Sequence, residues 1–315
     1  MKIDFVKMHG CGNDYVYLDA VNRPEVAGLI GSKRWSGLVR RMSDRHRGIG
    51  SDGVIALCRV TPTGVRAGAS VRMRMFNADG SEGKMCGNGV RCVAKFAHDR
   101  LGLRERPMRV QTGAGVLRID YRVSGGELVE ASVDMGRPGL RPRDCGVKAS
   151  RLSWISEDFR SCAVECAGGE VWIGTLVSMG NPHMVIFADE HPEQVGGCGG
   201  VARLDLARIG PKIERHPAFG DRINVHFVEV RSKREAVMRT WERGSGITQA
   251  CGTGACAAVV AGVLTGLLGR SVRMRLPGGD LDVRWDARSG RVVMTGPAEE
   301  VFEGVWVEDG RGSRG

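Results

Sequence analysis

The sequence has few aromatic residues, no long apolar run and no C-x-x-C motif. Aromatic side chains make up only 5% of its 315 residues, and the arginines that contribute to a net charge of +10 are scattered along the chain. Nucleic-acid-binding domains usually gather their basic residues in one patch or stripe. We therefore interpret the charge as a solvated basic surface that attracts small anionic molecules, and we expect no nucleic-acid partner.

The absence of apolar segments bears on location. No window is apolar enough to cross a bilayer, and the first residues, MKIDFVKMHGCGND, lack the apolar core of a signal peptide. We expect a cytoplasmic protein with no membrane partner, in which the ten cysteines stay reduced.

Most of these cysteines follow no pattern that indicates chemistry. A thiol redox or metal-binding protein would need a C-x-x-C motif or a compact ligand cluster, which makes this class the less favoured one. The C-x3-C pair formed by Cys162 and Cys166 is a weak zinc signal, because no second pair lies nearby in the sequence. We interpret the following as packing or surface residues: Cys11, Cys58, Cys92, Cys145, Cys198 and Cys256.

The chain contains an internal repeat. A shift of 165 residues places MCGNGVRCVAKFA (85–97) on ACGTGACAAVVAG (250–262), so that Cys86 falls on Cys251 and Asn77 falls on Glu242. Slightly different shifts align further segments: CGNDYVYLD (11–19) with MGNPHMVIF (179–187), GSDGVIAL (50–57) with DRINVHFV (221–228), and MRVQTGAGVLRIDY (108–121) with MRLPGGDLDVRW (274–285). One half is therefore a duplicate of the other.

Local patterns agree between the halves. VRMRMF (71–76) alternates like a half-buried strand, the residues after each repeated cysteine follow helical spacing, and MRLPGGDLDVRW contains a hairpin turn. We expect an α/β (α+β) fold of two pseudo-symmetric domains, each with strands wrapped around a central helix, and an active site in the cleft between them. The boundary is expected near Ser124-Gly125-Gly126, and residues 141–170 as a surface insertion.

A cysteine at a helix start has distinctive chemistry. The first turn presents unpaired N–H groups and the positive end of the helix dipole, which bind carboxylates and favour a thiolate. We expect this position to lower the thiol pKa from its usual value of about 8.5 toward neutrality. A single such motif would favour a buried cysteine beside a tight turn. Two matched copies suit a different reaction, in which one thiolate removes a proton and the opposite thiol delivers one, inverting a carbon centre.

The chain resembles the diaminopimelate epimerase family in five segments: HGCGNDYV, RGIGSDG, FNADGSEGKMCGNGVRC, MGNPH and ERGSGITQACGTGACA. The resemblance implies a cofactor-independent homodimer that interconverts LL- and meso-diaminopimelate for lysine and peptidoglycan precursor synthesis. It also implies that the last strand, in GPAEEVFEGVW, rejoins the first domain. The expected domains are then 1–130 with a return segment 298–315, and 131–297.

The resemblance also implies roles for individual residues. Cys86 and Cys251 match the catalytic acid/base pair, and no metal is implied. The matching substrate-binding positions, with His183 as a supporting polar residue, are Asn13, Gly53, Asn77, Gly87, Asn88, Asn181, Asn224, Glu242, Arg243, Gly252 and Thr253. Amides can hold ammonium and carboxylate groups without adding a competing base, and an arginine can clamp a distal carboxylate bidentately.

Each assignment has an alternative. Asn13 and Asn181 are also typical turn residues, His183 could be a core histidine, and Arg243 a surface arginine. Ile247 stands where the family often has a glutamate, which questions local loop contacts and substrate choice but not the reaction type. The closest competing function is racemisation of another amino acid by the same cysteine pair.

Overall fold

The computed structural model describes residues 1–158, 161–197 and 199–308, and it divides the chain into two compact units. Unit 1 holds Met1–Val133 and the chain from Gly296, and unit 2 holds Asp134–Thr295. The chain changes unit inside two strands, β8 (Glu127–Gly136) and β18 (Val292–Pro297). Cys198 and the end of the expected return segment, 309–315, lie outside the described residues.

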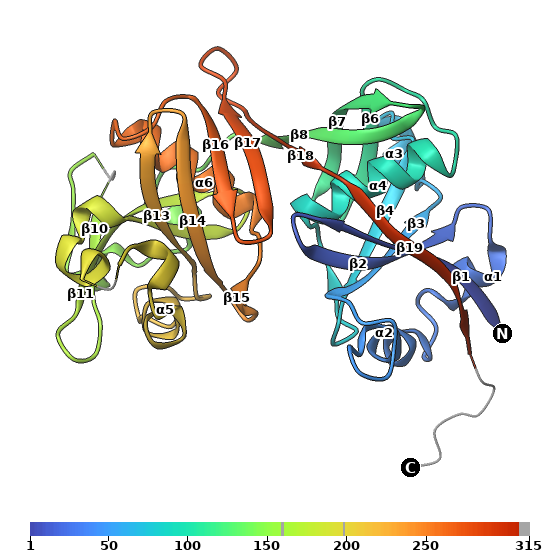
Figure 1. Ribbon diagram of the computed structural model, residues 1–315, viewed down its shortest axis with the longest axis horizontal. Coiled ribbons are helices and arrows are strands. Elements are labelled where there is room, and N and C mark those ends of the chain that lie inside the picture. Colours follow the sequence, from blue (N-terminus) through green and yellow to red (C-terminus); the bar gives the residue numbers. More distant parts are fainter. Residues whose placement is uncertain (159–160, 198, 309–315) are drawn as a thin grey trace. The chain divides into compact units, whose positions relative to one another are not determined.

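Unit 1 contains a mixed sheet with helices packed against it (Figure 1). Its strands are β1 (Lys2–Gly10), β2 (Asn13–Ala20), β3 (Gly53–Cys58), β4 (Val71–Asn77), β5 (Glu82–Gly83), β6 (Met108–Thr112), β7 (Gly115–Ser124), most of β8, and β19 (Glu299–Val307). Its helices are α1 (Pro24–Leu29), α2 (Trp35–Ser43), α3 (Pro62–Arg66) and α4 (Gly87–Asp99). β19 pairs antiparallel with β1, so the expected return of the last strand to the N-terminal half is confirmed.

Unit 2 repeats this plan. Its strands are β9 (Trp154–Ile155), β10 (Cys162–Glu165), β11 (Val171–Ser178), β12 (Pro182–Phe187), β13 (Asn224–Ser232), β14 (Glu235–Glu242), β15 (Gly246–Thr248), β16 (Ser271–Leu276), β17 (Gly279–Trp285) and most of β18. Its α-helices are α5 (Leu206–Glu214) and α6 (Gly252–Leu264). Short 3₁₀ or π turns precede α5 at Pro142–Cys145, Ala149–Arg151, Ala188–Glu190, Pro192–Gly196 and Val201–Arg203.

The strand pairings of the two units correspond one to one. In unit 1, β2 is parallel to β3, β3 antiparallel to β4, and β4 parallel to β6, and the same sequence of directions joins β12, β13, β14 and β16. The register agrees as well, because Val54 pairs with Phe76 where Val225 pairs with Trp241. This confirms the expected duplication.

One stretch of the repeat aligns differently from the sequence prediction. Thr112 and Gly115 close the β6–β7 hairpin, and Leu276 and Gly279 close the β16–β17 hairpin. Thr112 therefore corresponds to Leu276, a shift of 164 residues. The sequence alignment used a shift of 166, which places Met108 on Met274. Hairpin geometry fixes the register more strongly than two shared letters, because a slip would turn every side chain to the other face.

Residues 141–170 are not a surface insertion. Cys145, Val147, Cys162 and Val164 are all buried and belong to the hydrophobic core of unit 2, where they join the fully buried Trp172. β10 also pairs with β11 as β19 pairs with β1, so this segment supplies the strand that unit 1 takes from the C-terminus, and β9 pairs with the other side of β10. Sequence alignment missed this equivalence because the two strands occupy different places in chain order.

The boundary between the two units does not lie at Ser124-Gly125-Gly126, where the sequence predicts it. Gly125 and Gly126, at the expected boundary, form the turn between β7 and β8. Both have positive φ angles, as a two-glycine hairpin turn permits, and the strand continues to Gly136. The passage into unit 2 comes later, after Val133.

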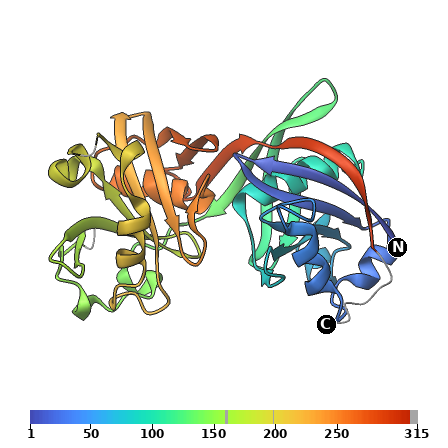
Figure 2. The same cartoon turned by 60° about the horizontal axis from the view of Figure 1, so that its bottom comes forward.

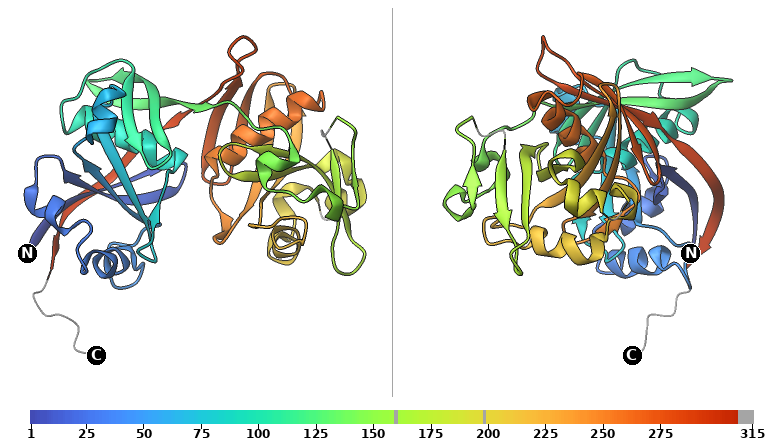
Figure 3. Two further views of the ribbon diagram at one scale, coloured as in Figure 1. Left: turned by 180° about the vertical axis from the view of Figure 1, so that it is seen from behind. Right: turned by 60° about the vertical axis from the view of Figure 1, so that its left-hand side comes forward.

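Each unit is organised around one central helix. Every residue of α4 from Gly87 to His98 is buried, and α6 is buried from Gly252 to Gly262 except at Thr253. In unit 1, α1 packs on β2 and α2 packs on β3, and α4 contacts both of these strands. In unit 2, α6 contacts β11, β12 and β17, among other strands (Figures 2 and 3). Alternate residues of β3 contact the two layers: Ile55 faces the start of α4, while Val54 packs with Leu38 of α2.

The described residues contain no helix long and apolar enough to cross a membrane.

We predict that Tyr17→Phe weakens the contact between β2 and α4. The buried Tyr17 hydroxyl donates a 3.0 Å hydrogen bond to the Gly89 carbonyl. Its removal should lower the free energy of unfolding by about 1 kcal/mol, the usual net value of one buried hydrogen bond. Urea denaturation measures this change. Tyr121→Phe is the control, because that hydroxyl makes no hydrogen bond within the described residues. Equal stability of both variants would contradict the prediction.

Candidate active site

Cys86 is the N-cap residue of α4, in the extended conformation that precedes a helix. Its half-buried sulfur accepts a hydrogen bond from the Gly89 N–H at 3.3 Å, as a serine or threonine cap would. The thiol donates to Oδ1 of Asn13 at 3.1 Å. The predicted helix start is confirmed, and the sulfur lies where the N–H groups and the positive end of the helix dipole favour negative charge.

The side chain of Asn13 is held in place by the carboxylate of Asp52. Its Nδ2 donates to Oδ2 of Asp52 at 2.6 Å, and Asp52 also accepts from Arg45 at 2.8 Å. Burial, with the neighbouring Asp14, raises the pKa of Asp52, whereas the cations Arg45 and Lys7 hold the pKa of Asp14 below its usual value although burial opposes this. Asn13 therefore does more than form a turn, because its side chain is fixed on the sulfur of Cys86.

Tyr15 also contacts Cys86, and the sequence reasoning assigned it no role. A side-chain hydrogen bond joins the two residues, and burial together with Cys86 raises the pKa of Tyr15 well above its usual value. The phenol consequently keeps its proton and can donate to the sulfur. The repeat contained the necessary signal, because it aligns Tyr15 with His183. Asp52 was missed for a different reason, since its counterpart, Ile223, is apolar.

The remaining unit 1 positions lie around the same strand ends and helix start. Asn77 ends β4 and donates to Ser81 at 3.0 Å, while Gly53, opposite it on β3, is packed so closely that a side chain would collide with the Phe76 carbonyl. Gly87 begins α4. Asn88, 2% exposed, accepts from the buried Arg91 at 3.0 Å.

Cys251 occupies the equivalent N-cap position of α6 but in a different environment. It is only 4% exposed, and burial, together with the carboxylate of Glu242, raises its pKa well above the usual value, although Thr253 opposes the change. This corrects the expectation that the helix start would make the thiol acidic. Desolvation penalises a buried thiolate more than the helix dipole stabilises it, so Cys251 is protonated at neutral pH.

A line of hydrogen bonds leads from the core of unit 2 to this sulfur. The links are Thr240 to His226 at 2.9 Å, His226 to His183 at 2.8 Å, His183 to Asn181 at 2.9 Å, Asn181 to Thr253 at 3.4 Å, and Thr253 to Cys251 at 3.6 Å. Burial lowers the pKa of His226 to about 3 and that of His183 well below its usual value, so both rings are neutral.

The neutral rings give this line a direction. The Asn181 Oδ1 can only accept, so His183 donates from Nε2 and accepts at Nδ1 from His226, which in turn accepts from Thr240. Asn181 then donates from Nδ2 to Thr253. Either atom can donate in the contact between Thr253 and Cys251, so the Thr253 hydroxyl can turn its proton to the sulfur and stabilise a thiolate at Cys251 when one forms.

His226 was not predicted from the sequence. Its counterpart in unit 1 is Ile55, so the repeat gave no polar signal there. The structure links the ring to the helix start, because a side chain at Gly254 would collide with it. His183 fits both of its sequence interpretations, since it is fully buried and also bonded toward the site.

The other unit 2 positions surround the same helix start. Asn224 begins β13, donates to the Pro182 carbonyl at 2.9 Å and accepts from the Arg243 N–H at 2.9 Å. Glu242 ends β14, makes a hydrogen bond with Cys251 and accepts from Thr248 at 2.6 Å. Gly252 begins α6. Ile247 lies on β15 with 48% of its surface exposed.

In unit 1, Asn13 contacts the predicted cysteine, and in unit 2, Glu242 and Thr253 contact theirs, with Asn181 and His183 linked to it through Thr253. The Arg243 guanidinium donates to the Asp221 carbonyl at 3.0 Å.

Among residues 1–158, 161–197 and 199–308, no group of three or more histidine, cysteine or acidic side chains could hold a metal ion. Cys145, Cys162 and Cys166 are buried packing residues, and burial raises the pKa of each. Cys92 and Cys256 are fully buried within the two central helices.

Known proteins resemble this chain over nearly its full length. Proteins named diaminopimelate epimerase match it at 42% identity in Geobacillus kaustophilus, 44% in Agathobacter rectalis and 45% in Desulfovibrio desulfuricans. These alignments cover 96%, 95% and 96% of this chain and 96%, 98% and 97% of the relatives.

Solved structures share the fold at much lower identity. A probable proline racemase from Agrobacterium radiobacter, with bound carbonate, aligns over 98% of this chain and 93% of its own, with a TM-score of 0.63 and 13% identity. A hydroxyproline epimerase from Agrobacterium vitis aligns over 97% and 91%, also with a TM-score of 0.63 and 13% identity. The model of the family described as diaminopimelate epimerase matches residues 5–140 and 175–301. The chain belongs to the diaminopimelate epimerase family.

Proposed function

We propose that this protein interconverts LL- and meso-diaminopimelate without a cofactor, using Cys86 and Cys251 as an acid/base pair. The supporting observation is the pair of cysteines at the starts of the two central helices, in a chain that is 42–45% identical to diaminopimelate epimerases over almost its whole length. The reaction would serve lysine and peptidoglycan precursor synthesis in the cytoplasm.

In the proposed mechanism the two sulfurs act on opposite faces of one α-carbon. The Cys86 thiolate removes the α-proton, so the C–H bond breaks and an S–H bond forms. The carbanion then takes a proton from the Cys251 thiol, and the negative charge ends on that sulfur. The protonated state of Cys251 suits it to donate, and the directed line through Thr253 stabilises the thiolate that remains. Reversal exchanges the two roles.

The substrate is proposed to bind through the helix starts and the surrounding amides. N–H groups at Gly87, Asn88, Gly252 and Thr253 would hold the carboxylate at the reacting centre and the charge that develops as the proton leaves. Arg243 would clamp the distal carboxylate. Contacts to the remaining polar groups of the amino acid would come from Gly53 and from the polar side chains Asn13, Asn77, Asn181, Asn224 and Glu242, with His183 holding Asn181 in place.

We also propose that the protein is a homodimer. Four apolar side chains of β19 are 46–59% exposed: Val301, Phe302, Val305 and Val307. β19 pairs only with β1 among the described strands, and an exposed apolar edge strand favours association unless another surface covers it. We propose that a second copy of the chain covers this strand. Sedimentation of the purified protein as a 34.0 kDa monomer at micromolar concentration would contradict this part of the proposal.

The alternative function is racemisation of another amino acid by the same pair. The solved racemase and epimerase structures support only the shared fold, because they are 13% identical to this chain. Comparing turnover of LL-diaminopimelate with that of proline, hydroxyproline, histidine and glutamate separates the two. Preferred turnover of any of the last four would overturn the proposed substrate.

We predict that Cys86→Ala and Cys251→Ala each reduce the rate of epimerisation by about 10²-fold or more. A positioned acid or base usually contributes about 10²-fold to 10⁴-fold. Each direction needs both groups, so neither single variant should retain one direction. Cys92→Ala is the matched control, because it removes a thiol from the interior of α4 without touching the sulfur at the helix start. Near-normal turnover by either active-site variant, with an unchanged circular dichroism spectrum, would remove the two-cysteine assignment.

A second prediction concerns the fate of the hydrogen in heavy water. The donating thiol exchanges with solvent before substrate binds, whereas the abstracting sulfur holds the substrate's own hydrogen. At low conversion the product should therefore contain deuterium at the inverted centre, while remaining substrate stays mostly protium. Mass spectrometry of the separated isomers measures both. Substrate labelled as fast as product, or product with little deuterium, would indicate a single base instead.

A third prediction follows from the raised pKa of Cys251. Below that pKa the thiol keeps its proton and can act as the acid, and above it the proton is lost, so the alkaline fall in kcat/KM should begin only above about pH 8.5, the usual cysteine value. Glu242→Gln removes a negative charge that raises this pKa and should move the alkaline fall to lower pH. Glu235→Gln, at the other end of β14, is the control. A fall at the same pH in the wild type and both variants would contradict this explanation.

A further inference from the structure

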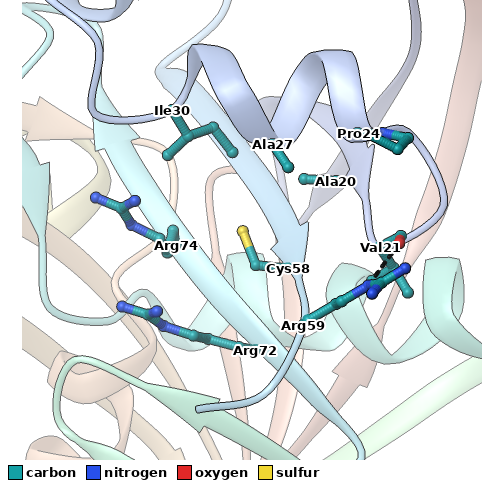
Figure 4. A pocket seen from close by; sticks show the side chains of 9 residues that line it. All are labelled: Ala20, Val21, Pro24, Ala27, Ile30, Cys58, Arg59, Arg72 and Arg74. Carbon is teal, nitrogen blue, oxygen red and sulfur yellow. Dashed lines mark hydrogen bonds between the residues drawn. The ribbon is translucent and has the colours of Figure 1, made fainter.

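Unit 1 contains a cavity of about 390 Å³ at the end of its sheet away from Cys86 (Figure 4). One wall comes from α1 and the residue after it, and the floor comes from the ends of three neighbouring strands. The lining residues are Ala20, Val21, Pro24, Ala27, Ile30, Cys58, Arg59, Arg72 and Arg74. Three of these side chains are cationic and none is acidic.

The three arginines differ in how far they are already paired. Arg74 makes two 2.8 Å hydrogen bonds to the carboxylate of Glu82 and lies over the Phe76 ring. Arg59 donates from Nε to the Val21 carbonyl at 3.2 Å, which leaves its terminal nitrogens without a hydrogen bond in the described chain. Arg72 has neither a hydrogen bond nor an ion pair there. Glu82 pairs with Arg74 and lies within electrostatic range of Arg72, so one carboxylate faces three arginines and the lining keeps an excess of positive charge.

In unit 2 a loop of the chain itself occupies the position that corresponds to this cavity. Arg239 corresponds to Arg74, and its Nη1 donates to the carbonyl oxygens of Val201, Ala202 and Leu204 at 2.8–3.2 Å. The connection that supplies those oxygens, residues 188–205 between β12 and α5, is four residues longer than its unit 1 counterpart, residues 21–34 between β2 and α2.

The opposite strand completes this comparison. Glu229, which corresponds to Cys58, accepts from the Val201 N–H and so holds the same loop over β13. In unit 1 no loop of this kind is present, and the smaller, uncharged Cys58 lies in the middle of the lining residues (Figure 4). Unit 1 thus differs from unit 2 in two ways: Arg74 is paired with Glu82 and not with loop carbonyls, and Arg72 stands where unit 2 has Val237.

We propose that the unit 1 cavity binds a small organic oxyanion, a carboxylate or phosphate ester with a short apolar chain. Arg59 and Arg72, whose guanidinium groups lie on either side of Cys58 in Figure 4, would each attract the charged group, since guanidinium groups match carboxylate and phosphate oxygens. The apolar chain would lie against Ala27 and Ile30, which form the wall opposite the sheet.

This site is separate from the reaction site in unit 1. β3 begins at Gly53 beside the active-site strand end and reaches the cavity at Cys58, while β4 leaves the cavity at Arg72 and ends at Asn77. The cavity therefore lies at the opposite end of both strands from the residues proposed to bind substrate. A ligand there would be an additional molecule, and its binding does not depend on the proposed reaction.

Cys58 provides a local reporter for binding. It is half-buried, and burial raises its pKa to about 11, so alkylation should be slow and sensitive to a molecule covering it. We would measure its alkylation by N-ethylmaleimide at pH 8.5, using peptide mass spectrometry to separate it from the other cysteines. The probes are butyrate, n-butyl phosphate, n-butylammonium and n-butanol, which share one apolar chain and differ in charge.

At least one anion should slow alkylation saturably by fivefold or more, and the stronger of the two identifies the preferred headgroup. The cation and the alcohol should have less than a twofold effect. Arg72→Gln and Arg59→Gln should each abolish the protection relative to their own ligand-free rate, while Arg118→Gln, an exposed arginine of unit 1, should retain it.

Three results would overturn the proposal: no saturable protection by either anion, equal protection by the cation or the alcohol, or full protection persisting in both cavity variants. Isothermal titration calorimetry with the protecting anion provides an independent measurement. It should detect binding by the wild type and by Arg118→Gln, and a loss of at least tenfold in affinity in Arg59→Gln, an exposed position whose replacement should not disturb folding.

Discussion

The position of each cysteine sulfur depends on the burial of one helix. α4 and α6 are enclosed along nearly their whole length, so neither helix can shift without opening a core. A helix fixed in this way also fixes the N–H groups of its first turn, and the residue before that turn has its side chain placed against them. The same burial that stabilises each unit therefore determines where a thiol meets the positive end of a helix.

The duplicated units place their two sulfurs in unequal surroundings. Cys86 is half-buried, accepts from the first turn of α4, and donates to Asn13, whose amide is held by the partly exposed carboxylate of Asp52. Cys251 is enclosed, protonated and reached by a directed line of neutral donors. The two sulfurs therefore differ in exposure and in hydrogen-bond partners, which is the asymmetry on which the proposed acid and base roles rest.

Divergence between the units is also visible away from the cysteines. Unit 2 covers the ends of its strands with its own loop, whose carbonyls accept from Arg239, while in unit 1 the equivalent Arg74 pairs with Glu82 and lines an open cavity. Unit 2 obtains its outer strand from β10, within the same half, whereas unit 1 obtains the equivalent strand from β19 at the far end of the chain. One ancestral plan has thus been completed in two ways, and the unfilled positions are where new binding can arise.

The return of the last strand was implied by the family resemblance. The sequence by itself determined the duplication, the helix start at each cysteine and the strand ends that surround it. These follow from local patterns, because glycine placement, apolar spacing and matched motifs act over a few residues. Tertiary structure alone decided the role of residues 141–170, the hairpin register at Thr112 and Leu276, and the participation of Tyr15, Asp52 and His226. It also decided that Cys251 keeps its proton, because desolvation depends on every atom packed around a group and no short stretch of sequence records that enclosure.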